Sequence, residues 1–415
     1  MNKKKVIVPA IIGNIVEYYD FGIYAVFAEI IARLFFPNLS EYIQLMFSFA
    51  IFAIGFLMRP LGGIIFGHLG DQLGRKFALT IAIIGMGICT LCISFLPTYN
   101  QIGILAPILL TVIRVFQGMC IGGEGAGSAV FVIEHFEYKK VGLIGSVIMA
   151  SSIMGTLLAM LIGIAIDYFI GIDDFSWRYG FFLGGIMGFV GLFMRYKTKE
   201  TPVFENIKIK GKVTKYPIQR VLKEKWQSIL IIGSFAGIIT ASTYTIRGFF
   251  NVYFCEIIGF SKETTLYVVS FTLFILIIFL PIFGYLADRV GYKKYIYSSI
   301  LIFISCIFPT FSIIVNNISN IEGIFYSVGL LALLVASLVA PYYPFAVKFF
   351  DPELRYSGIA LSWNLGNAFF GGTAPMVCTF LVMEIGNIGP AFYLLFVAFM
   401  FLFISFLNRK FLANH

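Results

Sequence analysis

The segment Gly67-His68-Leu69-Gly70-Asp71-Gln72-Leu73-Gly74-Arg75-Lys76 has a second copy in this chain of 415 residues. The second copy is Gly284-Tyr285-Leu286-Ala287-Asp288-Arg289-Val290-Gly291-Tyr292-Lys293. Each copy joins two long apolar segments, and each lies at the corresponding place in its half of the sequence. An internal repeat of this kind indicates that the chain is built from two related halves.

The composition is that of an integral membrane protein. Apolar residues make up 59% of the chain and charged residues only 12%, with a mean hydropathy of +0.92, whereas soluble proteins carry about 25% charged residues. Because about 20 apolar residues cross a bilayer as a helix, we expect twelve spans. They lie near 7–35, 42–66, 77–97, 103–135, 141–169, 179–196, 227–256, 264–286, 295–315, 321–348, 357–383 and 388–407.

These spans predict an all-α integral membrane protein with two pseudo-symmetric lobes of six transmembrane helices each. The first lobe is expected at 1–196 and the second at 227–415, with a basic cytoplasmic linker at 197–226. Repeats of this type are common in secondary transporters, in which two lobes move around a site at the middle of the membrane.

Most of the 30 Lys and Arg residues fall in alternate connections between the predicted spans. They include Lys3, Lys4, Lys5, Arg75, Lys76, Lys139, Lys140, the run from Arg195 to Lys225, Arg289, Lys293, Lys294, Lys348, Arg355, Arg409 and Lys410. The positive-inside rule therefore predicts that both termini are cytoplasmic. The same rule explains the net charge of +9, so we favour a linker on an anionic inner leaflet over a segment that binds nucleic acid.

Several other functional classes are not supported by the residues. The six cysteines lie within apolar spans without metal-ligand spacing, so we expect no disulfide, metal or cofactor. No nucleophile with an adjacent base and no phosphate-binding loop is present, which argues against an enzyme. Asn14, Glu17 and Asp20 interrupt the first apolar run, so we expect a retained helix rather than a cleaved signal peptide.

Polar residues inside spans are costly and therefore mark candidate sites. Asn14, Glu17, Asp20 and Tyr24 share one face of the first predicted helix, and Arg114, Gln117, Glu124 and Ser128 share one face of the fourth. At 1.5 Å per residue, Asp20 and Arg114 both lie near the middle of the membrane. We hypothesise that they pair in one state and that protonation of Asp20 or Glu17 releases the pair. The alternative is a permanent structural ion pair.

The second half has fewer intramembrane charges. Arg247 lies within the seventh predicted helix beside Thr243, Tyr244 and Asn251, where it could bind a carboxylate. Alternatively it extends outward or pairs with Glu256. In the eleventh helix, Asn364 and Asn367 lie beside Trp363 and could bind a ligand or bridge neighbouring helices.

These patterns give two sets of candidate residues. The predicted proton-coupling residues are Glu17, Asp20, Arg114 and Glu124. The predicted substrate-binding residues are Asn14, Tyr24, Gln117, Tyr244, Arg247, Asn251, Trp363, Asn364 and Asn367.

The repeated segment has a mechanical interpretation. Its glycines permit a tight turn, and Asp71 and Asp288 could each lie near the amino terminus of a neighbouring helix, where the dipole favours a negative charge. We interpret the segments as a cytoplasmic gate. The alternative is an ordinary turn with basic flanks.

Several motifs resemble those of the major facilitator superfamily, and within it the metabolite:proton symporter family of bacterial inner membranes, which includes proline/betaine, 2-oxoglutarate, citrate and shikimate transporters. The resemblance covers nearly the whole chain. The motifs are Gly13-Asn14-Ile15-Val16-Glu17-Tyr18-Tyr19-Asp20-Phe21-Gly22, Phe35-Phe36-Pro37, Arg59-Pro60-Leu61-Gly62-Gly63, Phe66-Gly67-His68-Leu69-Gly70-Asp71, Arg114-Val115-Phe116-Gln117-Gly118, Gly122-Gly123-Glu124, Trp177-Arg178, Glu200-Thr201-Pro202-Val203-Phe204 and Leu354-Arg355-Tyr356-Ser357-Gly358.

The resemblance implies roles for particular residues. Asp71, Arg75 and Asp288 resemble the cytoplasmic gate residues, and we include Gly67, Gly74 and Arg355 in the predicted gate. Asp20 with Arg114 resembles the proton-linked pair of related sugar:proton symporters. Lys348 stands where an acidic residue is frequent, which is a departure from the pattern at this end of the gate.

Taken with the residues, the resemblance implies proton-coupled uptake of a small polar organic solute, such as a proline/betaine-type osmolyte or a carboxylate like 2-oxoglutarate. We expect a monomer in the bacterial inner membrane whose partners are the substrate, protons and the lipid bilayer. Two alternatives stay open, namely an exporter or exchanger of metabolites or drugs, and a receptor that binds its ligand without moving it.

Overall fold

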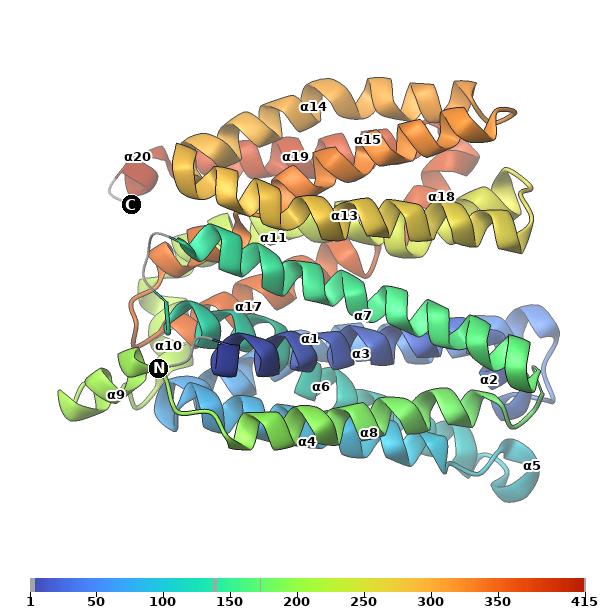
Figure 1. Ribbon diagram of the computed structural model, residues 1–415, viewed down its shortest axis with the longest axis horizontal. Helices are drawn as coiled ribbons and strands as arrows, with labels where there is room; N and C mark the ends of the chain where they lie inside the picture. The colour runs from blue at the N-terminus through green and yellow to red at the C-terminus, as the bar shows by residue number, and fades with distance from the viewer. Residues whose placement is uncertain (1–3, 137–139, 172, 414–415) are drawn as a thin grey trace. The chain divides into compact units, whose positions relative to one another are not determined.

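The computed structural model describes residues 4–136, 140–171 and 173–413 (Figure 1). Lys3 and Lys139, two of the residues used to predict orientation, lie outside the described residues. Within the described ranges, twelve helices are long and apolar enough to cross a bilayer, so the predicted all-α membrane fold is confirmed. Contacts divide the chain into two units, Met1–His135 with Ser151–Ile218 and Phe136–Ala150 with Gln219–His415.

Unit 1 contains most of the first six spans. Its long helices are α1 (Lys4–Val26), α3 (Glu41–Gln72), α4 (Arg75–Ser94), α6 (Leu105–Ile133), α7 (Val141–Ile170) and α8 (Trp177–Tyr196). Three shorter helices are α2 (Ala28–Phe35), α5 (Tyr99–Ile102) and α9 (Pro202–Ile209). The long helices lie side by side, with α9 at one end of the unit and α2 and α5 at the other (Figure 1). The first part of α7 belongs to unit 2.

Unit 2 contains six spans, three of which are interrupted. Its helices are α10 (Pro217–Glu224), α11 (Trp226–Tyr244), α12 (Phe250–Val252), α13 (Lys262–Val290), α14 (Tyr292–Asn316), α15 (Ile321–Val339), α16 (Tyr342–Ala346), α17 (Arg355–Gly366), α18 (Ala374–Ile385), α19 (Gly389–Leu407) and α20 (Arg409–Ala413). Wider π-helical turns follow α11 at Thr245–Phe249, follow α12 at Tyr253–Ile257, and join α17 to α18 at Asn367–Gly371. Such turns are rare and frequent at functional sites.

The first predicted span, near 7–35, is two helices rather than one. The break falls at Phe27, whose backbone angles (φ −101°, ψ 14°) depart from helical values. The Phe27 ring is 1% exposed and belongs to an apolar cluster with Tyr24 and Trp177. The bend therefore directs this ring into the core of unit 1, and it leaves the polar face of α1 intact because all four of its residues precede the break.

The repeated segment is mostly helical, which corrects the expected end of the second span near residue 66. Helix α3 continues to Gln72, and the chain turns at Gly74 (φ 113°); in the second copy α13 continues to Val290 and the turn is at Gly291 (φ 93°). Only glycine adopts these angles without strain. The helical Gly284 has a different role, because a Cβ there would lie 2.5 Å from the carbonyl oxygen of Gly142.

Helices α3 and α6 pack closely against each other in unit 1, and glycines make this approach possible. A Cβ on Gly118 would lie 2.3 Å from the carbonyl oxygen of Gly55, and one on Gly62 would lie 1.9 Å from that of Met119. Small residues permit this approach of two backbones in a membrane.

Candidate functional site

The predicted pair of Asp20 and Arg114 is present at the centre of unit 1. Arg114 Nη1 lies 3.3 Å from Asp20 Oδ2, and both side chains are at most 2% exposed. The Thr90 hydroxyl donates to Asp20 Oδ1 at 2.8 Å, and Gln117 donates to Thr90 and accepts from Arg114. Three helices, α1, α4 and α6, therefore hold one carboxylate in place.

Arg114 has donor capacity that this network does not use. Its guanidinium carbon lies 4.0 Å from the centre of the Tyr24 ring, a cation–π distance. Its Nε and Nη2 atoms are buried and have no hydrogen-bond partner among the described residues. Since buried donors are normally paired, these two nitrogens can donate hydrogen bonds to a further anionic or carbonyl group.

A second buried pair joins α1 to α3. Glu17 Oε1 lies 3.8 Å from Arg59 Nη2, and both side chains are 1% exposed. The Arg59 guanidinium also lies 4.5 Å from the ring of Phe21 and 4.7 Å from that of Phe56. The aromatic rings supply part of the stabilisation that water would give the cation.

A third buried pair joins α6 to the end of α8. Arg195 Nη1 donates to Glu124 Oε2 at 2.6 Å, and Arg195 Nη2 donates to Oε1 of the same carboxylate. A Cβ on Gly13 would lie 2.5 Å from this pair, so a glycine in α1 leaves room for it. The sequence placed Arg195 in a basic loop, but it is 3% exposed at the end of a membrane helix.

Removal of Arg195 provides a test of this third pair. In Arg195→Ala, Glu124 is left as a buried carboxylate without its cation, which costs about 3–5 kcal/mol. At about 2–4 °C per kcal/mol for a unit of this size, we expect the melting temperature in detergent to fall by about 10 °C, and Arg195→Ala/Glu124→Gln to recover at least half of that loss.

The matched control is Arg33→Ala. Arg33 pairs with Asp174, but their side chains are 61% and 69% exposed, and exposed pairs contribute little. A melting temperature for Arg195→Ala that equals that of Arg33→Ala would show that the buried pair does not stabilise the protein.

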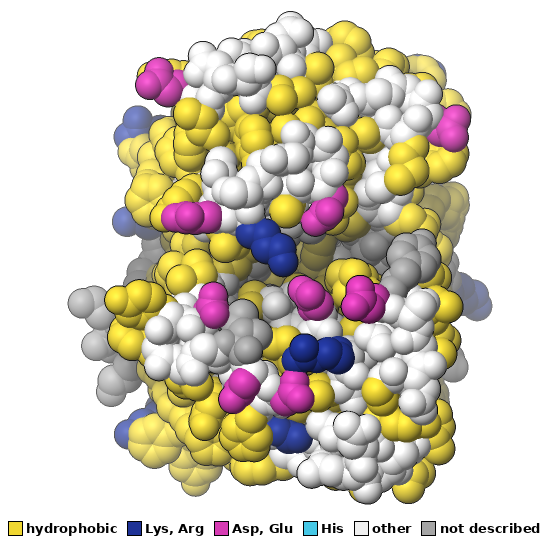
Figure 2. All heavy atoms as spheres, turned by 90° about the vertical axis from the view of Figure 1, so that its right-hand side faces the viewer, with side chains coloured by type: hydrophobic (Ala, Val, Ile, Leu, Met, Phe, Trp, Pro, Cys, Tyr) yellow, Lys and Arg dark blue, Asp and Glu magenta, His cyan; other side chains and the backbone are white. Residues whose placement is uncertain are grey.

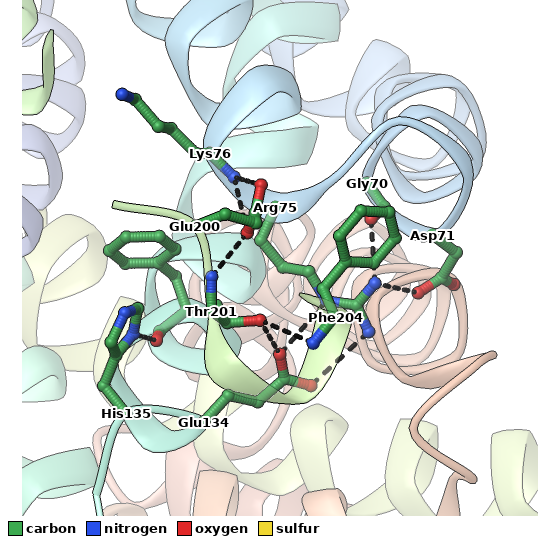
Figure 3. A network of polar contacts seen from close by, with 10 residues as sticks. Gly70, Asp71, Arg75, Lys76, Glu134, His135, Glu200, Thr201 and Phe204 are labelled. Atoms are coloured by element: carbon green, nitrogen blue, oxygen red, sulfur yellow. Dashed lines mark hydrogen bonds and ion pairs between the residues drawn. The ribbon is translucent and has the colours of Figure 1, made fainter. Parts of the chain in front are cut away.

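At the α9 end of unit 1, the first repeated segment forms a network around Arg75 (Figure 3). Arg75 lies 3.3 Å from Asp71 and 3.1 Å from Glu134, and it donates to the Gly70 carbonyl oxygen. Figure 3 shows the Phe204 ring beside it, 5.0 Å from the guanidinium. Asp71 and Arg75, the two charged gate residues predicted in the first half, thus belong to one buried cluster.

The start of the linker completes this network. The Thr201 hydroxyl donates to Glu134 at 2.7 Å and accepts from the Phe204 N–H, so it caps α9 and contacts the cluster at once. Glu200 accepts from the Lys76 N–H at 3.1 Å. Burial raises the pKa of Glu200 above its usual range, although the backbone donors and Arg75 act in the opposite direction. The start of the linker is therefore fixed to the helices of unit 1.

The second repeated segment uses its aspartate differently. Asp288 accepts from the backbone N–H groups of Gly142 and Leu143, at 2.7 and 2.9 Å, in the first turn of α7. The Tyr292 hydroxyl also donates to Asp288. The expected position of Asp288 at a helix amino terminus is confirmed. Of the other predicted gate residues, Gly67 is helical, Gly74 forms the turn, and Arg355 is buried at the start of α17.

The predicted substrate residues of unit 1 are already engaged within the protein. Asn14 donates to Ser151 at 3.0 Å, and the Tyr24 hydroxyl donates to the Ser48 carbonyl oxygen at 3.0 Å. Gln117 belongs to the Asp20–Arg114 network. Tyr24 and Gln117 both contact Arg114 and so help to orient the central pair, whereas Asn14 binds α7.

The predicted substrate residues of unit 2 lie at two different heights along the axes of their helices. A Cβ on Gly366 would lie 2.6 Å from the Ala236 side chain, which places Gly366 beside Ala236. Arg247 lies about 15 Å further along its helix at 1.5 Å per residue. Its carbonyl oxygen accepts from Asn251, and its guanidinium lies 6.0 Å from the Tyr244 ring. Arg247 and Asn251 are therefore separated from Trp363.

Trp363 and Asn367 lie at the other height along the helix axes, away from Arg247. Trp363 packs against Tyr342, with ring centroids 4.8 Å apart. Asn364 donates to the Ala360 carbonyl oxygen. Asn367 begins a π-helical turn, and a Cβ on Gly371 would lie within 3.0 Å of both Asn367 Oδ1 and the Tyr244 ring. Tyr244 thus lies nearer to Asn367 than Arg247 does.

Sequence reasoning missed several members of these clusters as site residues. They are Arg59, Thr90, Glu134, Arg195, Glu200, Tyr342 and Tyr343. The position of Arg59 in the middle of an apolar span was a usable signal, because such a cation needs a partner. Thr90 and the tyrosines carry no comparable signal.

Comparisons with known proteins agree with this architecture. The sequence matches the Major Facilitator Superfamily over residues 10–361. A putative proline/betaine transporter of Staphylococcus aureus (strain COL) is 34% identical, with 98% of this chain and 88% of the relative covered. The proline/betaine transporter of Escherichia coli (strain K12) is 31% identical, with coverage of 95% and 81%.

The fold also matches solved structures. The proton:xylose symporter XylE bound to 6-bromo-6-deoxy-D-glucose superposes with a TM-score of 0.75 at 17% identity, over 99% of this chain and 95% of that one. The human organic anion transporter MFSD10 gives a TM-score of 0.68 at 14% identity, over 98% of this chain and 99% of that one. The chain is a multi-pass membrane protein and a secondary transporter that belongs to the Major Facilitator Superfamily.

Proposed function

We propose that the protein couples proton entry to the uptake of a small polar organic solute of the proline/betaine or carboxylate type. The observation that carries this proposal is the buried Asp20–Arg114 pair between α1 and α6. A carboxylate that is paired with an arginine can change its proton affinity when that arginine is attracted elsewhere. The two free nitrogens of Arg114 offer a place for the anionic group of a substrate.

The coupling scheme follows from this competition. A substrate carboxylate that binds Arg114 weakens the attraction between Arg114 and Asp20, and Asp20 then accepts a proton. Glu17 and Glu124 are further proton-coupling residues, each with its own arginine. The halves 1–196 and 227–415 act as lobes that alternate between outward and inward access, joined by the linker at 197–226.

The proposed orientation places both termini in the cytoplasm of a bacterial cell, with the protein in the inner membrane as a monomer. In each unit, Figure 2 shows Asp and Glu side chains at helix ends, with some Lys and Arg side chains among them. The exposed acidic residues near the helix ends away from the repeated segments include Glu29, Glu41, Asp167, Asp173 and Asp174 in unit 1 and Glu256, Glu263, Glu322 and Glu384 in unit 2. Backbone donors from Phe175 and Ser176 lower the pKa of Asp173, which keeps it charged. An acidic outer face and a basic inner one fit the positive-inside rule.

The repeated segments are the proposed inner gate. Asp71 and Arg75 belong to the buried network of unit 1, and Asp288 binds the first turn of α7. Gly67, Gly74 and Arg355 complete the gate. Opening on this side would require these charged contacts to separate and become hydrated.

Uptake into proteoliposomes tests the proposal. The purified protein is supplied with labelled proline, glycine betaine, 2-oxoglutarate, citrate or shikimate under an inward proton gradient. We expect one class to accumulate and an uncoupler to abolish the accumulation. Uptake that is unchanged by the uncoupler, together with intact counterflow, would contradict proton symport and favour an exchanger or exporter. Saturable binding without any transport would favour a receptor.

A further inference from the structure

The Thr90 hydroxyl lies at a junction of three hydrogen-bonding partners inside unit 1. Its Oγ1 is 2.8 Å from Asp20 Oδ1, 2.8 Å from the carbonyl oxygen of Met86 and 2.9 Å from Gln117 Nε2. Thr90 and Asp20 are at most 2% exposed, and Gln117 is fully buried. A hydroxyl has one proton to donate and two lone pairs that accept. Thr90 therefore cannot donate to Asp20 and to Met86 at the same time.

The direction of the hydrogen bonds at this junction is fixed by Arg114, which can only donate. Arg114 Nη1 donates to Gln117 Oε1 at 2.7 Å and lies 3.3 Å from Asp20 Oδ2. Because Arg114 binds the amide oxygen of Gln117, the amide nitrogen points to Thr90, and a flipped amide would place N–H donors against the arginine. Thr90 therefore accepts from Gln117 and has its own proton left for one of two acceptors.

The two acceptors suit the two protonation states of Asp20. An ionised Asp20 takes the Thr90 proton in a charge-assisted hydrogen bond, while the Met86 carbonyl oxygen keeps the backbone N–H of Thr90, its ordinary helical partner. When Asp20 Oδ1 carries a proton, it donates to Thr90, whose own proton turns to Met86. The hydroxyl then donates once and accepts twice, which is its full capacity. Both states are satisfied, and neither requires a helix to move.

Packing against α8 holds the Thr90 side chain in this orientation. A Cβ on Gly184 would lie 3.1 Å from the Thr90 Cγ2 methyl group and 2.8 Å from the Tyr19 ring. The methyl group therefore lies against the glycine, while the hydroxyl contacts α1 and α6. Valine has the shape of threonine, so it would keep this contact and lose only the hydroxyl group.

The titratable groups that act on Asp20 electrostatically come from three helices, and they include Arg114, Tyr19 and Cys89. The Tyr19 hydroxyl donates to the Gly180 carbonyl oxygen at 2.8 Å, and a neutral thiol is a weak donor. The charged side chains that α3, α7 and α8 contribute lie near helix ends or in other pairs, namely Glu41, Arg59, Asp71, Asp167, Arg178 and Arg195. Thr90 therefore supplies a neutral hydrogen bond to Asp20 beside the charge of Arg114.

We propose that Thr90 is a positioning residue that sets the proton affinity of Asp20 by turning its hydroxyl between Asp20 and the Met86 carbonyl oxygen. Thr90 keeps its own proton throughout, and the proton that Asp20 takes up is the one supplied by the gradient. The donated hydrogen bond favours the ionised form of Asp20, which pairs with Arg114. The inference rests on the proposed proton coupling and adds the group that decides at which pH Asp20 is loaded.

The test is the titration of Asp20 itself, followed by infrared spectroscopy of the detergent-purified protein. The carbonyl stretching band of the protonated carboxyl group is assigned to Asp20 by its loss in Asp20→Asn. In Thr90→Val the midpoint should move to higher pH by about one unit, which is an about tenfold rise in proton affinity, because hydrogen bonds to an ionised group are the stronger ones. Thr90→Ser keeps the hydroxyl and should shift the midpoint by less than half as much.

Thr80→Val is the matched control, because Thr80 lies on the same helix and its hydroxyl donates to the Lys76 carbonyl oxygen at 2.7 Å. It should leave the proton affinity of Asp20 within about twofold of the wild type. An unchanged midpoint in Thr90→Val would overturn the proposal. Equal shifts in Thr90→Val and Thr90→Ser would do the same, because a general disturbance of the site would then be the cause. If Thr90→Val does not fold, Thr90→Ala gives the same comparison.

The infrared titration does not depend on transport, so the two proposals can fail separately. Uptake that is unchanged by an uncoupler, with the shift in Thr90→Val present, would count against proton symport alone. Accumulation that an uncoupler collapses, with no shift in Thr90→Val, would count against the role of Thr90 alone. If both proposals hold, the pH of half-maximal uptake by proteoliposomes should move in Thr90→Val in the same direction as the infrared midpoint.

Discussion

Asp20→Asn is expected to abolish accumulation of substrate against its gradient while leaving exchange across the membrane largely intact. Asparagine has nearly the same shape as aspartate. It can still accept the hydrogen bond from the Thr90 hydroxyl, which is 2.8 Å long in the wild-type structure. It can neither carry a charge nor bind a proton, so its attraction for Arg114 no longer depends on protonation. Substrate can therefore bind and cross, but the proton gradient cannot drive it.

The measurement uses an inward gradient of about two pH units. With one proton per substrate, this gradient sustains about a hundredfold accumulation, since each tenfold ratio corresponds to about 1.4 kcal/mol. We expect the accumulation ratio of Asp20→Asn to fall to about one, with counterflow exchange at a substantial fraction of the wild-type rate.

The control for this prediction is Asp174→Asn. It removes a carboxylate that is 69% exposed and pairs with Arg33 at the far end of unit 1. Accumulation should be unaffected. If Asp20→Asn accumulates substrate to the wild-type ratio, Asp20 has no proton role and its pair with Arg114 is a structural contact between α1 and α6.

Gly62→Ala is expected to be the most damaging single-methyl substitution in unit 1. A Cβ at this position would lie 1.9 Å from the carbonyl oxygen of Met119 and 2.9 Å from its Cα. Both atoms belong to the backbone of α6, so no side chain can move aside, and the helices must separate by more than about 1 Å. Overpacking of this kind costs about 1–3 kcal/mol or more.

The separation would also disturb the buried charges. Arg59 lies on α3, and Arg114 and Glu124 lie on α6, so a shift of one helix relative to the other changes the geometry of three ion pairs together. We expect a fall of roughly 5–10 °C in the melting temperature measured in detergent, and loss of most transport activity.

Gly55→Ala is the matched control at the same interface. Its Cβ would meet its nearest neighbour, the Phe21 ring, at 3.5 Å, an ordinary contact. We expect it to change the melting temperature by no more than about 2 °C, because alanine is also the better helix former. Equal melting temperatures for the two variants would show that the close approach of α3 and α6 does not limit the packing of unit 1.

The polar faces of single helices were predictable, because the period of 3.6 residues places Glu17 and Asp20 together on α1 and Arg114 and Gln117 together on α6. Their depth followed from the rise per residue, which led to the pair of Asp20 with Arg114. The position of Asp288 at the start of α7 followed from helix electrostatics. Each of these inferences required only the geometry of a single helix, or of two helices together with the depth of their residues in the membrane.

The separation of Arg247 from Trp363 could not be predicted in this way. It depends on the level at which α11 lies against α17, which the contact of Gly366 with Ala236 establishes. The π-helical turns at Thr245–Phe249 and Asn367–Gly371 shift the register of the residues that follow them. No apolar period in the sequence marks such turns.

Twelve apolar runs, alternate basic connections and a repeated segment were sufficient to establish a two-fold repeated membrane protein, because a bilayer forces the backbone into helices and charge into the connections. Apart from the pair of Asp20 with Arg114, which arginine neutralises which carboxylate depended on tertiary packing. Arg195 illustrates the difference: beside other basic residues it had the pattern of a loop charge, yet it is buried against Glu124. Side chains from three or four helices come into contact only where glycines allow the helices to pack closely. The hydropathy of the sequence carries no information about these contacts.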